Sequence, residues 1–191
     1  MSKRMKRTVL GGAALAAMAV LAMPGYAFAA PGDITGSETV VAGTLSYSSP
    51  AAVGFPQTTL DGTDKVASTT QAFDVSDLTG SGAGWKITLT STTFTSGAYG
   101  LAATATTDAA APTSACDAGV TCTLGDNASV TYPLAVPAAA TAPTAVTIQS
   151  AALNTGLSGQ TWTHTMHLAI PSNTRALTYT STWTYTLASA P

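Results

Sequence analysis

Apolar and polar residues alternate along much of the chain with the period of two that is typical of β-strands. In residues 162–170 the even positions carry mostly large apolar side chains, and threonine, histidine or alanine lies between them. In residues 177–187 the apolar side chains take the odd positions and threonines take the even ones. Residues 171–174, with the sequence PSNT, separate the two segments and predict either a hairpin or a crossing between sheets.

Other segments show the same alternation, and no segment has a convincing helical period. Residues 85–90 and 130–136 alternate clearly, and four weaker strands are expected at 41–47, 73–78, 99–105 and 146–151. Residues 102–112, rich in alanine and threonine, and residues 137–143, with the sequence PAAATAP, are expected to be loops or crossovers. Because each strand has one apolar face, the sequence predicts an all-β fold, an antiparallel two-sheet sandwich of about eight strands.

The N-terminus has the three-part layout of a secretory signal peptide. Four basic residues lie within the first seven positions, an apolar run follows to Met23, and the sequence AFA occupies residues 27–29. The alternative is a membrane anchor, but the run is shorter than the ~20 residues that a membrane span needs. We therefore expect a cleavable signal peptide in residues 1–30, cut after Ala29 or Ala30, and a single domain in residues 31–191.

Removal of this segment changes the charge of the chain. Residues 31–191 keep three cations, Lys65, Lys86 and Arg175, and nine acidic residues, so their net charge is −6. The same residues contain 34 Thr and 16 Ser, which suits the solvated faces of sheets. This composition is not that of a nucleic-acid binder, which carries basic patches. With no second apolar run and no C-terminal sorting signal, any attachment to the cell is expected to be non-covalent.

The two cysteines bracket a short loop. Cys116 and Cys122 are separated by five residues. Export to an oxidising compartment permits a disulfide, whereas a metal site needs more ligands and a redox motif normally has two intervening residues. We expect a structural disulfide that closes a surface loop.

Two tryptophan-containing segments resemble the WxL cell-wall-binding domain. The first is DLTGSGAGWKITL at residues 77–89, and the second combines AIPSN at 169–173 with YTSTWTYTLASAP at 179–191; GTLS at 43–46 fits the opening strand of that family. Neither triplet is literally W-x-L, because the third residue is Ile87 after Trp85 and Tyr185 after Trp183. The resemblance implies a secreted Gram-positive surface protein that binds peptidoglycan non-covalently. It also implies association with other surface proteins.

The tryptophans have two interpretations. Trp85, Trp162 and Trp183 all fall on the apolar faces of their predicted strands. A buried tryptophan is a common centre of a β-sandwich, so we expect all three in the core. The alternative is that one ring at the rim stacks on a sugar of the wall.

Candidate catalytic and metal-binding residues are few. His164 and His167 lie three apart, and residues three apart in a strand point to opposite faces, so one strand cannot chelate a metal with both. Asp74 and Asp77, a candidate carboxylate pair by proximity, are set on opposite faces by the same rule. Residues 61–64 (DGTD) form a turn that lacks the rest of a calcium loop. We expect no enzyme activity, no metal and no cofactor.

The final segment carries a row of threonines: Thr178, Thr180, Thr182, Thr184 and Thr186. One interpretation is a soluble sheet face, and the other is a flat hydroxyl array that contacts wall glycan. The functional hypothesis is a secreted, non-catalytic protein of the cell wall or cell surface that binds peptidoglycan or an associated wall glycan. The alternative is a structural or adhesive subunit that assembles with other surface proteins.

Overall fold

The computed structural model describes residues 36–101, 104–107 and 110–189. The chain divides into two units, Met1–Thr39 and Val40–Pro191. Only residues 36–39 of the first unit are described, so the signal peptide expected in residues 1–30 lies outside the described part and stays a prediction. The second unit contains all of the regular structure described below.

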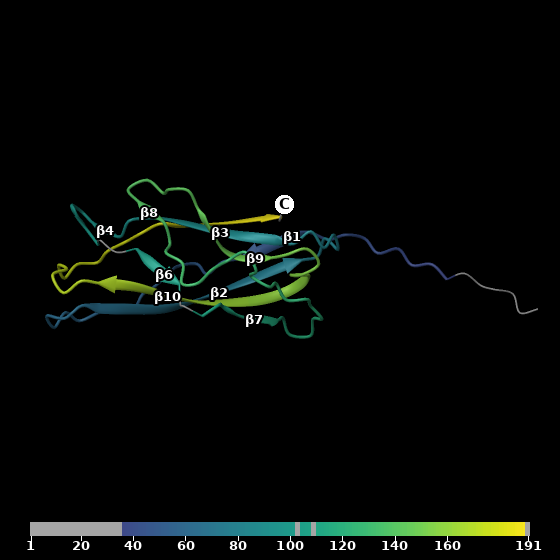
Figure 1. The fold of residues 1–191 in the computed structure, drawn as a ribbon, viewed down its shortest axis with the longest axis horizontal. Helices are drawn as coiled ribbons and strands as arrows, with labels where there is room; N and C mark the ends of the chain where they lie inside the picture. The colour runs from purple at the N-terminus through teal and green to yellow at the C-terminus, as the bar shows by residue number, and fades with distance from the viewer. Residues whose placement is uncertain (1–35, 102–103, 108–109, 190–191) are drawn as a thin grey trace, which may run out of the picture. The chain divides into compact units, whose positions relative to one another are not determined.

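A sheet of five antiparallel strands forms one layer of the second unit, here called sheet A (Figure 1). Its strands are β1 (Leu45–Ser48), β2 (Lys65–Asp77), β10 (Ser158–Ile170), β6 (Ala105–Thr107) and β7 (Thr113–Cys116). Strands β2 and β10 pair along all 13 residues. Both β6 and β7 pair with β10, so this long ladder is the centre of the sheet.

A four-stranded sheet, sheet B, forms the other layer. Its strands are β3 (Trp85–Thr92), β11 (Trp183–Ser189), β8 (Ala138–Ala139) and β9 (Val146–Ala151). Strand β3 pairs antiparallel with β11 and β9 and parallel with β8. A small hairpin of β4 (Thr95–Ser96) and β5 (Tyr99–Gly100) follows β3.

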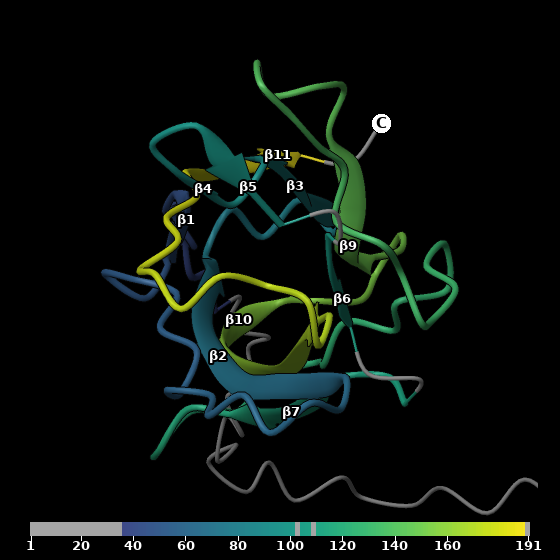
Figure 2. The ribbon, with the colours of Figure 1, turned by 90° about the vertical axis from the view of Figure 1, so that its left-hand side faces the viewer.

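The two sheets face each other, and the described residues contain no helix (Figure 2). The prediction of an all-β fold with packed antiparallel sheets is therefore confirmed. The connection after β10 leads from sheet A to β11 in sheet B, so residues 171–174 cross between sheets instead of forming a hairpin.

One side of the unit is closed by a segment that bonds to both sheets. The Val136 amide donates to the Ala105 carbonyl of β6 at 2.8 Å, and the Ser91 amide of β3 donates to the Pro137 carbonyl at 2.9 Å. Consecutive residues therefore hydrogen-bond to sheet A and then to sheet B. This hydrogen bonding satisfies backbone groups that would otherwise lie at open sheet edges.

The two ends of the unit differ. The end where β2 finishes and β10 begins carries the Cys116–Cys122 disulfide, whose Cα atoms lie 5.6 Å apart, and is called the disulfide end. The predicted disulfide is thereby confirmed. At the opposite end β10 finishes and β11 begins, and a cleft described below gives this cleft end its name. The main core lies between the sheets and includes Val75, Trp85, Ile87, Leu89, Ile148, Trp162 and Met166.

Several predicted strands differ from the observed ones. Residues 130–136 form no strand, and only Ala135 makes an isolated bridge, with Thr106. Pro133 has no amide hydrogen, and it interrupts a ladder that the alternation suggested. Residues 99–105 divide into β5 and the first residue of β6, and the expected loops 102–112 and 137–143 contain β6 and β8. Short pairing of this kind has no periodic signal.

The last predicted strand begins later than expected. Strand β11 starts at Trp183, whereas residues 177–182 form no strand beyond a bridge at Thr180. Leu177, predicted to share the buried face, is 47% exposed. Residues 177–182 cross from sheet A to sheet B, so the alternation in sequence begins before strand β11 does.

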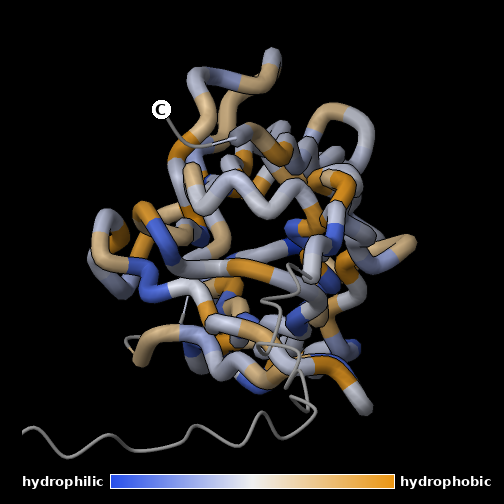
Figure 3. Tube along the Cα trace, turned by 90° about the vertical axis from the view of Figure 1, so that its right-hand side faces the viewer, coloured by the Kyte–Doolittle hydropathy of each residue, from blue (hydrophilic) through white to orange (hydrophobic). Residues whose placement is uncertain are grey.

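Most of the described residues have intermediate hydropathy. Figure 3, which shows the disulfide end, has pale colours along most of the trace, since threonine, serine and glycine have intermediate hydropathy. Strongly hydrophilic positions are few, as the low content of charged residues requires. Among the described residues, no helix is long and apolar enough to cross a membrane.

Candidate functional site

Two of the three tryptophans are core residues. Trp85 is 0% exposed and Trp162 is 2% exposed, and their rings meet edge to face with centroids 6.2 Å apart. The Trp85 indole donates to the Gly156 carbonyl at 2.9 Å, and the Trp162 indole donates to Gln160 Oε1 at 3.0 Å. Both rings are therefore buried, as the core interpretation predicted, and cannot stack on a sugar.

Trp183 differs from the other two, because it packs against the margin of the core and is only partly buried. The ring is half-buried, and it packs against Phe55 and Phe94 with centroids 6.4 and 6.5 Å away. Its Nε1 is buried and has no hydrogen-bond partner in the described structure. The indole lies at the cleft end, where the core opens, because β11 begins at this residue. In the motif-like triplets, Ile87 is fully buried and Tyr185 is half-buried.

The two histidines occupy opposite faces of β10, as predicted. His164 lies in the core, and its Nε2 is 3.1 Å from Gln149 Oε1. Burial lowers the pKa of His164 to about 4, because the interior disfavours the charged imidazolium. His167 lies on the outer face, where its Nδ1 is 2.8 Å from the Ser68 hydroxyl.

The candidate carboxylate pair is separated in the same way. Asp77 is buried and accepts hydrogen bonds from the Thr79 amide and hydroxyl at 3.0 and 2.6 Å, whereas Asp74 is exposed. Sequence reasoning missed that Asp74 and Asp117 lie against the same hydroxyl, because Asp117 is distant in sequence. Thr161 Oγ1 lies 2.9 Å from Asp74 Oδ1 and 3.0 Å from Asp117 Oδ1. No group of three or more potential metal ligands occurs among the described residues.

At the predicted turn of residues 61–64, Asp61 forms an ion pair with Lys65 and accepts hydrogen bonds from Thr63. Lys65 Nζ lies 2.6 Å from Asp61 Oδ2, and Thr63 donates to Asp61 Oδ1 through its amide and hydroxyl. The hydrogen bond from Lys65, followed by those from Thr63, lowers the pKa of Asp61 to about 2. Asp64 accepts from the Ser172 amide at 2.7 Å, which ties the start of β2 to the crossing segment.

The predicted threonine row has two parts. Thr184 and Thr186 are exposed on the outer face of β11. In register with them on β3 lie Thr90 and Thr88, and Thr88 is in turn opposite Thr147 of β9. Thr90 donates to the Pro143 carbonyl at 2.7 Å, so its hydroxyl is occupied. The hydroxyl surface of sheet B, here called the threonine face, therefore comprises Thr88, Thr147, Thr184 and Thr186.

The first part of the row leaves the sheet. Thr178 lines the cleft, Thr180 exchanges two backbone hydrogen bonds with Thr95 at 2.9 Å, and the Thr182 amide donates to Thr92 Oγ1 at 2.9 Å. The row is thus not the single strand face that alternation predicted. Sequence reasoning also missed Thr88 and Thr147, because only the cross-strand register brings them beside Thr186.

A cleft with a volume of about 880 Å³ opens at the cleft end, the end that faces the viewer in Figure 2. Its floor is a small apolar cluster of Phe94, Leu101 and Leu168. Residues 53–60 form one wall and residues 174–179 form the other. Pockets of this size accept small ligands or short peptide segments, and the lining is mainly apolar.

Arg175 is the charged residue of the cleft. Its guanidinium carbon lies 4.3 Å from the centroid of the Tyr99 ring, a cation–π contact. The Tyr99 ring is itself 44% exposed on the β4–β5 hairpin. The Tyr179 hydroxyl donates to the Arg175 carbonyl at 3.2 Å, which fixes the backbone of this wall. None of the residues that line the cleft is acidic.

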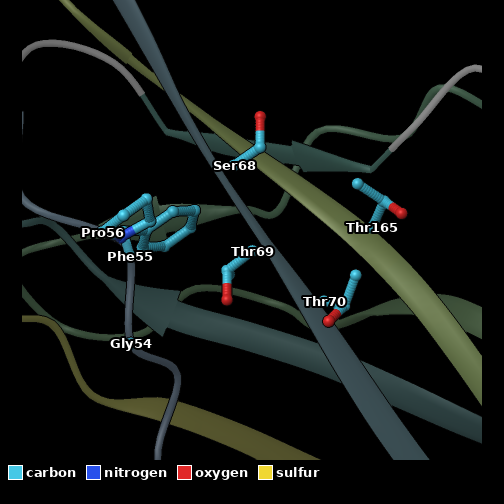
Figure 4. Close-up of a pocket in the computed structure, with 7 residues that line it drawn as sticks. All are labelled: Gly54, Phe55, Pro56, Ser68, Thr69, Thr70 and Thr165. Atoms are coloured by element: carbon cyan, nitrogen blue, oxygen red, sulfur yellow. The ribbon is translucent and has the colours of Figure 1, made fainter.

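A shallow hollow adjoins the cleft on the outside of β2 (Figure 4). Phe55 and Pro56 lie beside the strand, and Ser68, Thr69 and Thr70 follow it. Residues 54–56 thus separate the hollow from the cleft. Strand β1 pairs with residues 74–77 of β2, and residues 54–56 lie beside residues 68–70 of the same strand.

Comparisons with known proteins were made at three levels. No family model, no curated protein and no solved structure matches the chain. The resemblance to the WxL domain therefore stays a prediction from the two tryptophan segments, and the site is interpreted from its own geometry.

Proposed function

We propose that this protein is a secreted, non-catalytic cell-surface protein that binds the Gram-positive wall non-covalently, with peptidoglycan or an associated wall glycan as the ligand. The observation that carries the proposal is the threonine face of sheet B. Its hydroxyls come from three neighbouring strands, β11, β3 and β9, in direct register. The resemblance of the tryptophan segments to the WxL domain supports the same function.

The chemistry of this face suits the neutral sugars of a polysaccharide. Each hydroxyl donates one hydrogen bond and accepts others, which complements the hydroxyl and amide groups of a glycan. Threonine has few rotamers, so ordering the face on binding costs little side-chain entropy. Lys86 lies on the same outer face, opposite Ala188 and Ser150, and supplies a positive charge at its edge.

The test removes hydroxyls without changing strand propensity. The triple variant Thr88→Val, Thr184→Val, Thr186→Val should lose about a hundredfold in affinity for purified peptidoglycan, because three hydrogen bonds of about 1 kcal/mol each are removed. The matched control is Thr70→Val, Thr163→Val, Thr165→Val on the outer face of sheet A. Co-sedimentation measures both variants, and equal binding by the two would refute the role of the threonine face.

The alternative function, a subunit that assembles with other surface proteins, is favoured by a separate observation. Val40 and Val41 are 90% and 82% exposed at the disulfide end, and the cleft at the opposite end is mainly apolar. Exposed apolar residues of this kind mark interaction sites when a complementary surface exists. The two functions use different surfaces, so one protein can have both.

A further inference from the structure

We propose that the cleft binds residues 38–41 of a second copy of this chain, so that copies associate head to tail. The inference goes beyond wall binding and does not depend on it. It rests on three features of the described residues: an exposed apolar segment at one end, a complementary cleft at the other, and opposite charges on the two.

The segment that would be inserted is exposed and adjoins a fixed point. Val40 and Val41 are the most exposed large apolar residues in the described part of the chain, and they precede the start of β1. The Gly43 amide donates to the Leu78 carbonyl at 2.7 Å, which fixes the chain at the disulfide end. Two adjacent valines in water expose apolar surface whose burial by a partner would stabilise the contact.

The cleft offers the matching environment. Phe94, Leu101 and Leu168 form its apolar floor, and Leu177 on one wall is 47% exposed. Insertion of two valines would cover both the floor and Leu177. On the two walls, Gln57, Thr58 and Thr178 supply polar groups for the backbone of an extended segment.

Charge sets the direction of the segment. Glu38 lies two residues before Val40 in the sequence, and Arg175 lies at the wall of a cleft whose lining has no acidic residue. A carboxylate from a second copy would meet the Arg175 guanidinium, which already stacks on Tyr99 and is thereby preorganised. The rest of the acidic chain would repel an anion, so this pairing contributes specificity.

The segment cannot reach the cleft of its own chain. Val40 is three residues from Gly43, a reach of about 10 Å. Strand β2 connects the two ends of the unit with 13 residues, and a strand of that length spans roughly 40 Å. Occupancy of the cleft by Val40 and Val41 must therefore come from another copy. Such a contact joins different surfaces of the two copies, so it propagates into a ring or an open chain.

The test uses residues 31–191 and two sets of variants. The Val40→Asp, Val41→Asp variant has an intact cleft, and the Arg175→Glu, Leu177→Asp variant has an intact segment. The unsubstituted protein should show a molar mass that rises with concentration in light scattering, and each variant alone should be a monomer. An equimolar mixture of the two variants should form a 1:1 dimer and nothing larger, because only one complementary contact remains.

A charge swap gives the sharpest control. Glu38→Lys and Arg175→Glu should each weaken association by about tenfold, and the double variant should recover it, whereas Leu153→Asp, an exposed leucine outside both surfaces, should have no effect. Monomers at every concentration, or equal effects of Leu153→Asp, would overturn the proposal. It would also fail if Arg175→Glu lowered wall binding with no change in mass, since the cleft would then hold a wall fragment. Loss of wall binding in the threonine-face variant with association unchanged keeps the two proposals separate.

Discussion

Gly156 shows how closely single residues are fitted around Trp85. Its φ is +72°, in the left-handed region, and a Cβ atom there would meet the Ala151 Cβ and the Trp85 indole nitrogen at distances shorter than any normal contact. Its carbonyl also accepts the Trp85 indole hydrogen bond. Close approach and positive φ together therefore require glycine at this position.

Gly156→Ala should destabilise the protein by about 3 kcal/mol or more, because strain in φ adds to a steric clash in the core. Gly119→Ala is the matched control, since Gly119 has φ +75° but open space around it, and its cost should be only about 1 kcal/mol. Urea unfolding measures both. Equal midpoints for the two variants would show that Trp85 and Ala151 accommodate the methyl group.

His164 makes stability depend on pH. Its folded-state pKa is about 4, below the ordinary value of 6.5, so the unfolded chain binds a proton that the folded chain excludes. The stabilisation is complete above pH 6.5 and is lost as pH falls towards 4. Between pH 6.5 and 5 the loss should be about 2 kcal/mol.

The measurement is the free energy of unfolding at these two pH values in the unsubstituted protein, in His164→Gln and in His167→Gln. The His164 variant should lose most of the difference, and the His167 control should keep it. If both variants declined in parallel with the unsubstituted protein, carboxylates and not His164 would set the acid sensitivity.

At the scale of elements, β11 depends on Trp183. Among the described strands it pairs only with β3, and its first residue packs against Phe55, Phe94 and Tyr185. Trp183→Ala should cost about 3 kcal/mol, the lower end of the range for large aromatic residues, since the ring is half-buried. The melting temperature should fall and wall binding at lower temperature should persist. An unchanged melting temperature with lost wall binding would make the ring a ligand contact.

Strand existence followed from the sequence, whereas strand bounds and pairing did not. Alternation identified β3, β9 and β10, because each has one face in the core. It missed the first eight residues of β2, where alanine, serine and threonine give little contrast between faces. It also extended β11 back to residue 177, since the crossing segment carries the same alternating residue types. Local pattern encodes burial, but it does not encode the partner.

The candidate site was predictable only in part for the same reason. Thr184 and Thr186 stood out in sequence, but their neighbours Thr88 and Thr147 belong to strands far away in the chain. The cleft joins residues 53–60 with residues 174–179, neither of which has regular structure. Contacts between irregular segments leave no periodic trace, so Arg175 gained significance only from the fold.

At the scale of the molecule, the net charge of −6 in residues 31–191 determines how salt affects wall binding. Attraction to anionic wall polymers cannot drive association, so added salt screens mainly repulsion. Raising NaCl from about 50 to 500 mM should leave the bound fraction in a peptidoglycan pull-down unchanged or slightly higher. A steep loss of binding would indicate that Lys86 or Arg175 contacts a wall anion directly.

The direction of the first and last strands has a practical consequence. Strand β1 begins opposite Asp77, and β11 ends opposite Trp85, so both leave the unit at the disulfide end. A fluorescent reporter or a surface tether joined after β11 would be held away from the cleft by the length of the β2–β10 ladder. Immobilisation through that end would present every cleft outward, in one orientation.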